Sequence, residues 1–71
     1  MKKGDVVECV DAKQSDYLTN GKKYEVTSGQ GDSGRFGYIY SDTGFEIIDD
    51  DGEEIFQFRL DGLHGLFEVQ K

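Results

Sequence analysis

Proline and tryptophan are absent from the 71 residues of this chain, which also carries only one cysteine and one histidine. The single cysteine, Cys9, cannot form an internal disulfide, and the chain holds no Cys/His set for a structural zinc site. The core must therefore be built from apolar side chains alone. Nine aromatic residues, five Phe and four Tyr, supply large buried area per residue and make such a core feasible.

Basic residues are also scarce, since eight Lys and Arg stand against fifteen Asp and Glu, a formal net charge of −7. Nucleic acids and anionic membranes need a basic surface, so the charge argues against both and favours basic proteins or cations as partners. No apolar run reaches membrane-spanning length, and Met1-Lys2-Lys3-Gly4 leads into a charged strand instead of the apolar part of a signal peptide. We therefore expect a cytoplasmic protein with no membrane association.

Two strand–turn signatures dominate the chain. Asn20-Gly21 precedes an alternating strand, and Asp51-Gly52 lies between two apolar segments. Both dipeptides favour the positive φ angles of tight β-turns. Together with the alternation of apolar residues, they predict an all-β chain with at most one helical turn, near residues 15–18. The strands that we expect are Asp5–Asp11, Lys22–Ser28, Phe36–Tyr40, Phe45–Asp49, Ile55–Arg59 and Leu66–Val69.

Residues 1–71 are expected to form one small domain. In the first strand, Val7 and Cys9 share one face, and in the second strand Tyr24 and Val26 point inward. Five or six short antiparallel strands with short turns fit a small closed barrel, because closure hides the sheet edges. The two glycines of 60–65 predict a tight turn or one 3₁₀ turn there.

The segments 17–26, 47–53 and 66–69 together resemble one family, the small phage- and prophage-encoded β-barrels of the Src-homology-3-like type, most of which have no assigned function. The resemblance covers most of the chain and implies the fold, a five- or six-stranded Src-homology-3-like barrel, and a phage accessory protein in the bacterial cytoplasm. Gly29–Gly44 departs from the pattern because it is longer than the usual connection, so an individual function is expected there. The missing tryptophan argues against polyproline recognition.

The densest charge lies at the tip of the second predicted hairpin. Seven acids and no base occur from Asp42 to Glu54. This segment can be a solvated turn, a weak site for Ca²⁺ or Mg²⁺, or an acidic surface that docks a basic protein patch. The spacing of an EF-hand loop is absent, so no metal or other cofactor is predicted. The candidate partner-binding residues are Asp49, Asp50, Asp51, Glu53 and Glu54.

The short aromatic strand carries a second candidate surface. Alternation places Phe36, Tyr38 and Tyr40 on one face and Ile39 on the other. The aromatic face is either barrel core or, if Ile39 points inward, an exposed patch that Tyr17 could join. Exposed tyrosines bind proteins well because a rigid ring carries both contact area and a hydroxyl. Tyr38 and Tyr40 are therefore also candidate partner-binding residues.

Two features that could indicate an enzyme have structural interpretations. Gly29–Gly34 matches G-x-G-x-x-G, but a strand follows it where a dinucleotide-binding fold needs a helix. His64 has no serine or cysteine in a recognisable nucleophile elbow, and we expect its ring to pack on Leu60 or Leu66. The sequence therefore indicates no catalytic residue.

Three functions remain open on the sequence alone. The first is a non-enzymatic acidic module that binds a host or phage protein with a basic surface, in its sharper form an inhibitor of a nucleic-acid-binding host protein by charge mimicry. The second is a self-associating structural protein that uses sheet edges or an apolar patch. The third is an oligonucleotide-binding barrel, for which the clustered bases Lys2-Lys3 and Lys22-Lys23 could meet at one end of the barrel.

Overall fold

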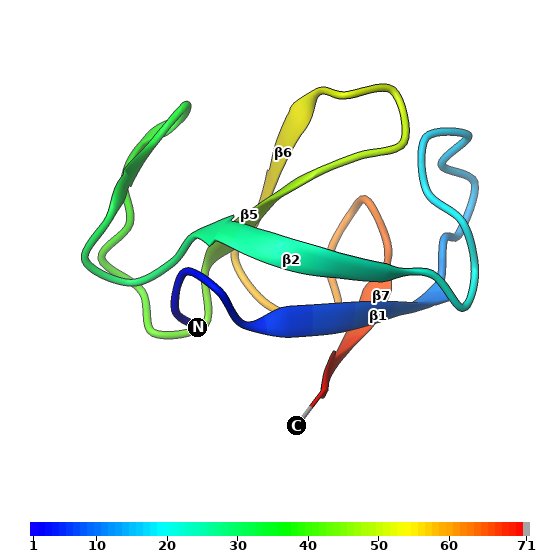
Figure 1. Ribbon diagram of the computed structural model, residues 1–71, viewed down its shortest axis with the longest axis horizontal. Coiled ribbons are helices and arrows are strands. Elements are labelled where there is room, and N and C mark those ends of the chain that lie inside the picture. The colour runs from blue at the N-terminus through cyan, green and yellow to red at the C-terminus, as the bar shows by residue number, and fades with distance from the viewer. Residues whose placement is uncertain (71) are drawn as a thin grey trace.

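Seven strands form the protein in the computed structural model, which describes residues 1–70. Five of them build one antiparallel sheet in the order β6-β5-β2-β1-β7, and the other two pair as a small separate hairpin. Figure 1 shows the larger sheet curled into a half-barrel, with the small hairpin projecting at one side. The strands are β1 (Val6–Asp11), β2 (Lys23–Ser28), β3 (Ser33–Gly34), β4 (Gly37–Tyr38), β5 (Phe45–Ile48), β6 (Glu54–Gln57) and β7 (Leu66–Gln70).

The predicted fold class is confirmed: the protein is all-β and compatible with a small Src-homology-3-like barrel. The predicted strands coincide with β1, β2, β5, β6 and β7 to within two residues at each end. The sheet is not closed into a complete barrel as we expected, because β6 and β7 lie at the two ends of the strand order and do not pair with each other. The described part of the chain contains no helix. It therefore has no helix that is long and apolar enough to cross a bilayer.

The two turn dipeptides act as predicted. Gly21 and Gly52 both have a φ of +83°, a conformation that glycine adopts without the strain that a Cβ would bring. The Gly52 amide donates to the Asp49 carbonyl at 3.1 Å and closes the turn between β5 and β6. The carboxamide of Asn20 accepts a bond from the Ala12 amide at 2.7 Å, which ties the long connection 12–21 to the end of β1.

The core lies on the concave face of the half-barrel. Phe67 packs edge-to-face against Tyr24 and Phe45, with ring centroids 6.3 and 5.7 Å apart. Each fully buried side chain of this size contributes about 1.5–3 kcal/mol. The inward positions predicted by alternation are confirmed, and the buried apolar cluster consists of Val7, Cys9, Ala12, Leu18, Tyr24, Val26, Phe45, Ile47, Ile55 and Phe67.

The connection 12–21 forms hydrogen-bonded turns. The sequence predicts at most one helical turn there, near residues 15–18. The Ser15 amide donates to the Ala12 carbonyl at 2.9 Å, and the Leu18 amide donates to the Ser15 carbonyl at 3.3 Å. These turns bring Leu18 into the core, where its side chain is buried. The connection is therefore anchored in the core by Leu18 and by Ala12 at its start.

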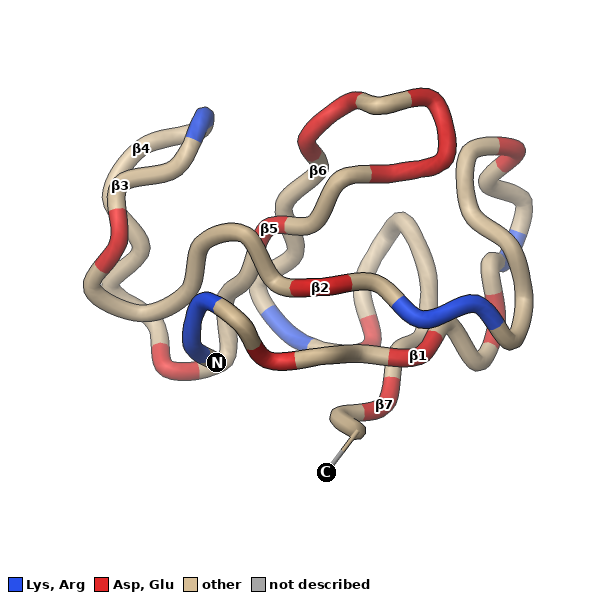
Figure 2. Tube along the Cα trace, viewed as in Figure 1, with Lys and Arg blue, Asp and Glu red and all other residues tan. Residues whose placement is uncertain are grey.

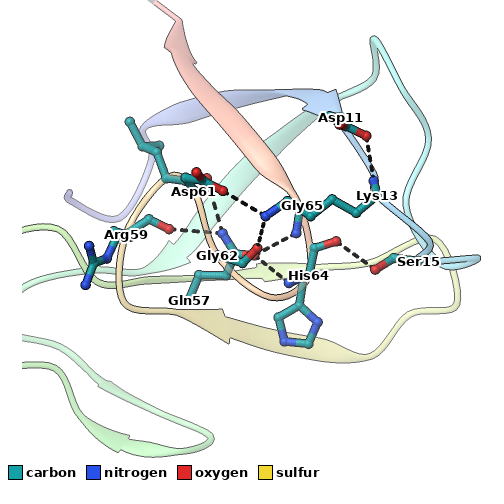
Figure 3. Close-up of polar contacts among 10 residues, drawn as sticks. Asp11, Lys13, Ser15, Gln57, Arg59, Asp61, Gly62, His64 and Gly65 are labelled. Atoms are coloured by element: carbon teal, nitrogen blue, oxygen red, sulfur yellow. Dashed lines mark hydrogen bonds and ion pairs between the residues drawn. The ribbon is translucent and has the colours of Figure 1, made fainter.

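Gln57, at the end of β6, organises the loop that leads to β7 (Figure 3). Its Oε1 accepts hydrogen bonds from the amides of His64 and Gly65 at 3.0 and 2.9 Å, and its Nε2 donates to the Arg59 carbonyl at 3.0 Å. A Cβ on Gly62 would lie 2.7 Å from Gln57 Cδ, so only glycine lets the loop pass this closely. One buried side chain thus satisfies backbone groups that have no strand partner.

Replacing Gln57 with methionine, which has a similar volume, removes these hydrogen bonds without leaving a large cavity. We expect Gln57→Met to lower the free energy of unfolding by about 1–3 kcal/mol, because buried amides that lose their acceptor cost that much. Urea denaturation measures the difference. Gln14→Met, at an exposed position, is the matched control and should stay within about 0.5 kcal/mol of the wild type. Equal losses in both variants would contradict the role assigned to Gln57.

Candidate functional site

Four aromatic side chains line a hollow of about 240 Å³ on the outer face of β5 and β6. Phe36 and Tyr38 come from the β3–β4 hairpin, and Phe56 and Phe58 come from β6 and the residue after it. We call this hollow, with the four aromatic side chains that line it, the aromatic groove. Phe36, Tyr38 and Phe58 are 61, 51 and 71 % exposed, respectively. Large apolar side chains gathered around one hollow mark an interaction surface more strongly than single exposed residues do.

The orientation of Ile39 decides which side of the hairpin faces outward. Ile39 is 4 % exposed and lies under the groove, so Phe36, Tyr38 and Tyr40 point away from the core. The interpretation of this aromatic face as barrel core is therefore wrong, and the alternative of an exposed patch is right. Tyr40 is 81 % exposed and packs its ring on Tyr38 at a centroid distance of 4.5 Å, outside the lining of the groove.

Phe56 and Phe58 were not among the predicted site residues, although the turn register could have identified them. The Asp51-Gly52 turn pairs Ile47 with Ile55, which places both on the core face. The next pair, Glu46 and Phe56, must then lie on the opposite face. Counting the register outward from the turn thus predicts that Phe56 faces away from the core.

A buried carboxylate holds the β3–β4 hairpin against the sheet. Glu46, in the middle of β5, is fully buried and accepts hydrogen bonds from the amides of Arg35 and Phe36 at 3.2 and 3.3 Å. These two residues form the turn of the hairpin, and Gly37 follows with a φ of +114°. A Cβ on Gly34 would lie 2.0 Å from Glu46 Oε2, so the close approach requires glycine. The carboxylate thus fixes the position of Phe36 in the lining of the groove.

Two of the five predicted acidic site residues are engaged in the fold. Asp49 is buried, and its Oδ1 accepts bonds from the amides of Asp51 and Glu53 at 3.0 and 2.8 Å. Asp50 pairs with Lys22 at 2.6 Å and accepts a bond from Thr19 Oγ1 at 2.6 Å. The bond from Lys22 is the largest cause that lowers the pKa of Asp50 to about 2.

The other three acids stay at the surface. Glu53 pairs with Arg35 at 3.0 Å, which joins the acidic turn to the tip of the β3–β4 hairpin. Asp51 is exposed and Glu54 half-buried, and neither has an ion-pair partner within residues 1–70. Glu54 lies two residues before Phe56 on β6, so both side chains are on the outer face. The acidic surface that remains available is therefore smaller than the sequence indicates, and it adjoins the aromatic groove.

The glycine loop 29–34 has its amides occupied. The Gly29 amide donates to Asp32 Oδ2 at 2.9 Å, and the Gln30 amide donates to the Met1 carbonyl at 2.9 Å. The Gly31 amide bonds the Ile39 carbonyl at the same distance. A phosphate-binding loop needs such N–H groups to point at its ligand, so this geometry does not support one.

The histidine is held in a structural contact. His64 Nδ1 lies 2.6 Å from the Tyr17 hydroxyl, and the two rings meet edge-on with centroids 5.7 Å apart. This contact differs from the predicted packing on Leu60 or Leu66, and it also keeps Tyr17 away from the aromatic patch. Asp61, the nearest acid in sequence, pairs instead with Lys13 at 2.7 Å. The described residues therefore offer no carboxylate–histidine pair for proton transfer.

Cys9 is fully buried, and burial raises the pKa of its thiol above the ordinary value. Its surroundings do not favour the thiolate that a nucleophilic or metal-binding cysteine needs. Within residues 1–70, no group of three or more His, Cys, Asp or Glu side chains is placed to hold a metal ion.

The two lysine pairs lie at opposite ends of β1 (Figure 2). The Cys9 amide donates to the Lys22 carbonyl at 2.9 Å, whereas Lys2-Lys3 precedes Gly4, whose amide bonds the Val26 carbonyl. The suggestion that the two lysine pairs meet at one end of the barrel is therefore wrong. Acidic segments separate the two pairs along the trace in Figure 2.

Comparison with known proteins gives no relative for this chain: no protein-family model, no curated protein and no solved structure matches it.

Asp50 provides a test of the charge network beneath the acidic turn. We expect Asp50→Asn to lower the Tm at neutral pH, because the amide cannot pair with Lys22. The folded-state pKa of about 2 lies below the ordinary 3.8, so the stabilisation is complete above about pH 5 and is lost as the pH falls toward 2. The Tm difference from the wild type should shrink over that interval. Asp51→Asn, at the neighbouring exposed position, should match the wild type throughout, and a pH-independent loss in Asp50→Asn would contradict the ion pair.

Proposed function

We propose that this protein is a non-enzymatic protein-binding module and that the aromatic groove is its principal contact surface. The observation that carries the proposal is the convergence of four aromatic rings on one hollow at the protein surface. Rigid aromatic side chains supply most of the binding energy in many protein interfaces, because they bury large area at little entropic cost. The insertion that departs from the resembled family, Gly29–Gly44, contributes half of these rings.

Charge defines the chemistry of the partner. The segment from Glu46 to Asp61 holds seven acids and one base, Arg59. Glu54 lies on the outer face of β6 with Phe56, Asp51 is exposed in the turn before β6, and neither has an internal ion pair in residues 1–70. A partner segment that carries apolar side chains and lysines or arginines is complementary to both features, because opposite charge speeds encounter and fixes register. The partner is thus a protein with a basic surface, and a phage accessory role acting on a host or phage protein remains the prediction from resemblance.

Charge mimicry of nucleic acid is a weaker form of the proposal. Asp49 and Asp50 are committed to the turn and to Lys22, so fewer carboxylates are available to imitate phosphates. Catalysis is not proposed, because His64 is bound to Tyr17 and Cys9 is buried. Self-association through a sheet edge competes with the proposal, and the concentration dependence of the sedimentation coefficient separates the two.

The test is affinity capture from bacterial lysate with a tag at the C-terminus. The N-terminus is avoided because the Met1 amino group bonds the Asp42 carbonyl and the Met1 carbonyl accepts from Gln30. We expect Phe58→Ser to weaken the captured complex at least about tenfold, equivalent to about 1.4 kcal/mol, because an exposed groove residue is lost. Its Tm should stay near that of the wild type, since Phe58 is 71 % exposed.

The matched control is Val10→Ser, which removes a half-exposed apolar side chain from β1, outside the groove. It should bind like the wild type. A second variant, Asp51→Asn with Glu54→Gln, tests the acidic contribution, which about 0.5 M salt should also weaken by screening. A partner held equally by Phe58→Ser and the wild type but lost by the acidic variant would overturn the groove and restore the acidic turn as the working surface.

A further inference from the structure

Strand β6 has an unpaired edge beside the aromatic groove. The strand order ends at β6, whose other side pairs with β5 through Glu46↔Phe56 and Ile47↔Ile55. No strand within residues 1–70 pairs with the outer side of β6. An exposed edge offers a row of N–H and C=O groups that can accept another extended chain.

The turn geometry shows which backbone groups of β6 face outward. The Asp49 amide donates to the Glu53 carbonyl at 2.8 Å, so Asp49 and Glu53 form a hydrogen-bonded pair. Because bonded and non-bonded pairs alternate along an antiparallel ladder, Ile55 bonds to β5, whereas Glu54 and Phe56 direct their backbone groups outward. Phe56 therefore presents both its ring and its free backbone groups at the same place.

A hollow lies on each side of this edge. One is the aromatic groove, and the other, of about 250 Å³, is lined by residues that include Gln57, Leu63 and His64. Phe56 and Phe58 line both hollows and stand between them. An extended chain directs successive side chains to opposite faces, so a strand added to β6 would place them alternately toward the two hollows.

The charge of the surface selects the occupant. A second copy of this chain would bring the same acid-rich segment, seven acids and one base from Glu46 to Asp61, against itself. Like charges placed together across an interface disfavour that pairing. An extended segment of another protein with alternating apolar and basic residues meets the same edge with opposite charge.

We propose that the partner binds as an added β-strand on the free edge of β6, with its apolar side chains in the aromatic groove. This mode rests on the proposed function, because it names the chemistry of the segment that the groove accepts. Main-chain bonds to Glu54 and Phe56 supply affinity, and the groove supplies selection of the side chains. The residues that carry the edge contact are Glu54 and Phe56, and those that carry selection are Phe36, Tyr38 and Phe58.

The experiment is an NMR titration of the ¹⁵N-labelled protein with the end-blocked heptapeptide KVKFKVK, followed by amide hydrogen exchange. The Glu54 and Phe56 amides should exchange about tenfold more slowly at a peptide concentration ten times the Kd, since exchange then requires dissociation. Two control peptides share its length and apolar pattern: the charge-reversed EVEFEVE, and KVKFKVK with N-methyl groups on its three apolar residues. In an antiparallel added strand, the apolar residues that enter the groove direct their own amides toward β6, and the N-methyl groups block these amides, so neither control should protect Glu54 or Phe56.

Each other outcome overturns a defined part of the account. Peptide-induced shifts at Phe36 and Tyr38 without protection of Glu54 and Phe56 would retain the groove and overturn strand addition. Full protection in the Phe58→Ser variant would retain the edge and overturn the groove as the selecting surface. If neither the groove residues nor Glu54 and Phe56 shift up to about 1 mM peptide, both the groove and the strand addition are overturned. A Kd above about 1 mM corresponds to a binding free energy weaker than about 4 kcal/mol. Protection of both amides without peptide that rises with protein concentration would assign the edge to a second copy.

Discussion

The buried carboxylate of Glu46 holds the β3–β4 hairpin, whose two strands pair with each other and, within residues 1–70, not with the five-stranded sheet. The β3–β4 hairpin has the turn residues Arg35 and Phe36, a pair with none of the positive-φ preference that tight hairpins use. Glu46 accepts hydrogen bonds from both of their amides, and Gly34 leaves room for the approach. Since a charged group buried without partners is costly, these bonds also explain how β5 tolerates an acid in its centre. This contact places Phe36 in the lining of the aromatic groove, together with Phe56.

The acidic residues divide into those that maintain the structure and those that are available at the surface. Asp49 closes the turn between β5 and β6, and Asp50 connects that turn to Lys22, which directly precedes β2. Asp51 stays exposed in the turn, and Glu54 lies on the outer face of β6 with Phe56. The same short segment thus stabilises the β5–β6 hairpin and makes the electrostatic potential negative at the proposed binding edge. The net charge of −7 alone does not separate these two roles.

The sequence is sufficient for the fold wherever a local signal and the core agree. Asn20-Gly21 and Asp51-Gly52 locate the main turns, and alternation locates the inward residues of β1 and β2. It is insufficient where a distant segment covers the outer face of a strand, because alternation then assigns a buried residue to solvent. Glu46 is such a residue. Gln57 is a separate case, because it is a polar side chain buried on the core side of β6. The candidate site is affected in the same way: Tyr38 follows from the local pattern, whereas its neighbours Phe56 and Phe58 require the register of the β5–β6 hairpin.

Amide hydrogen exchange at Arg35 and Phe36 tests the central claim most directly, since both residues are exposed and lie outside the strands. If Glu46 holds the hairpin over the sheet, both amides exchange slowly in the wild type and rapidly in Glu46→Ala, while the amides of the core strand residues Val7 and Val26 stay protected in both proteins. Rapid exchange of Arg35 and Phe36 in the wild type would show that the hairpin is not held there. The groove and the functions built on it would then lose their structural basis.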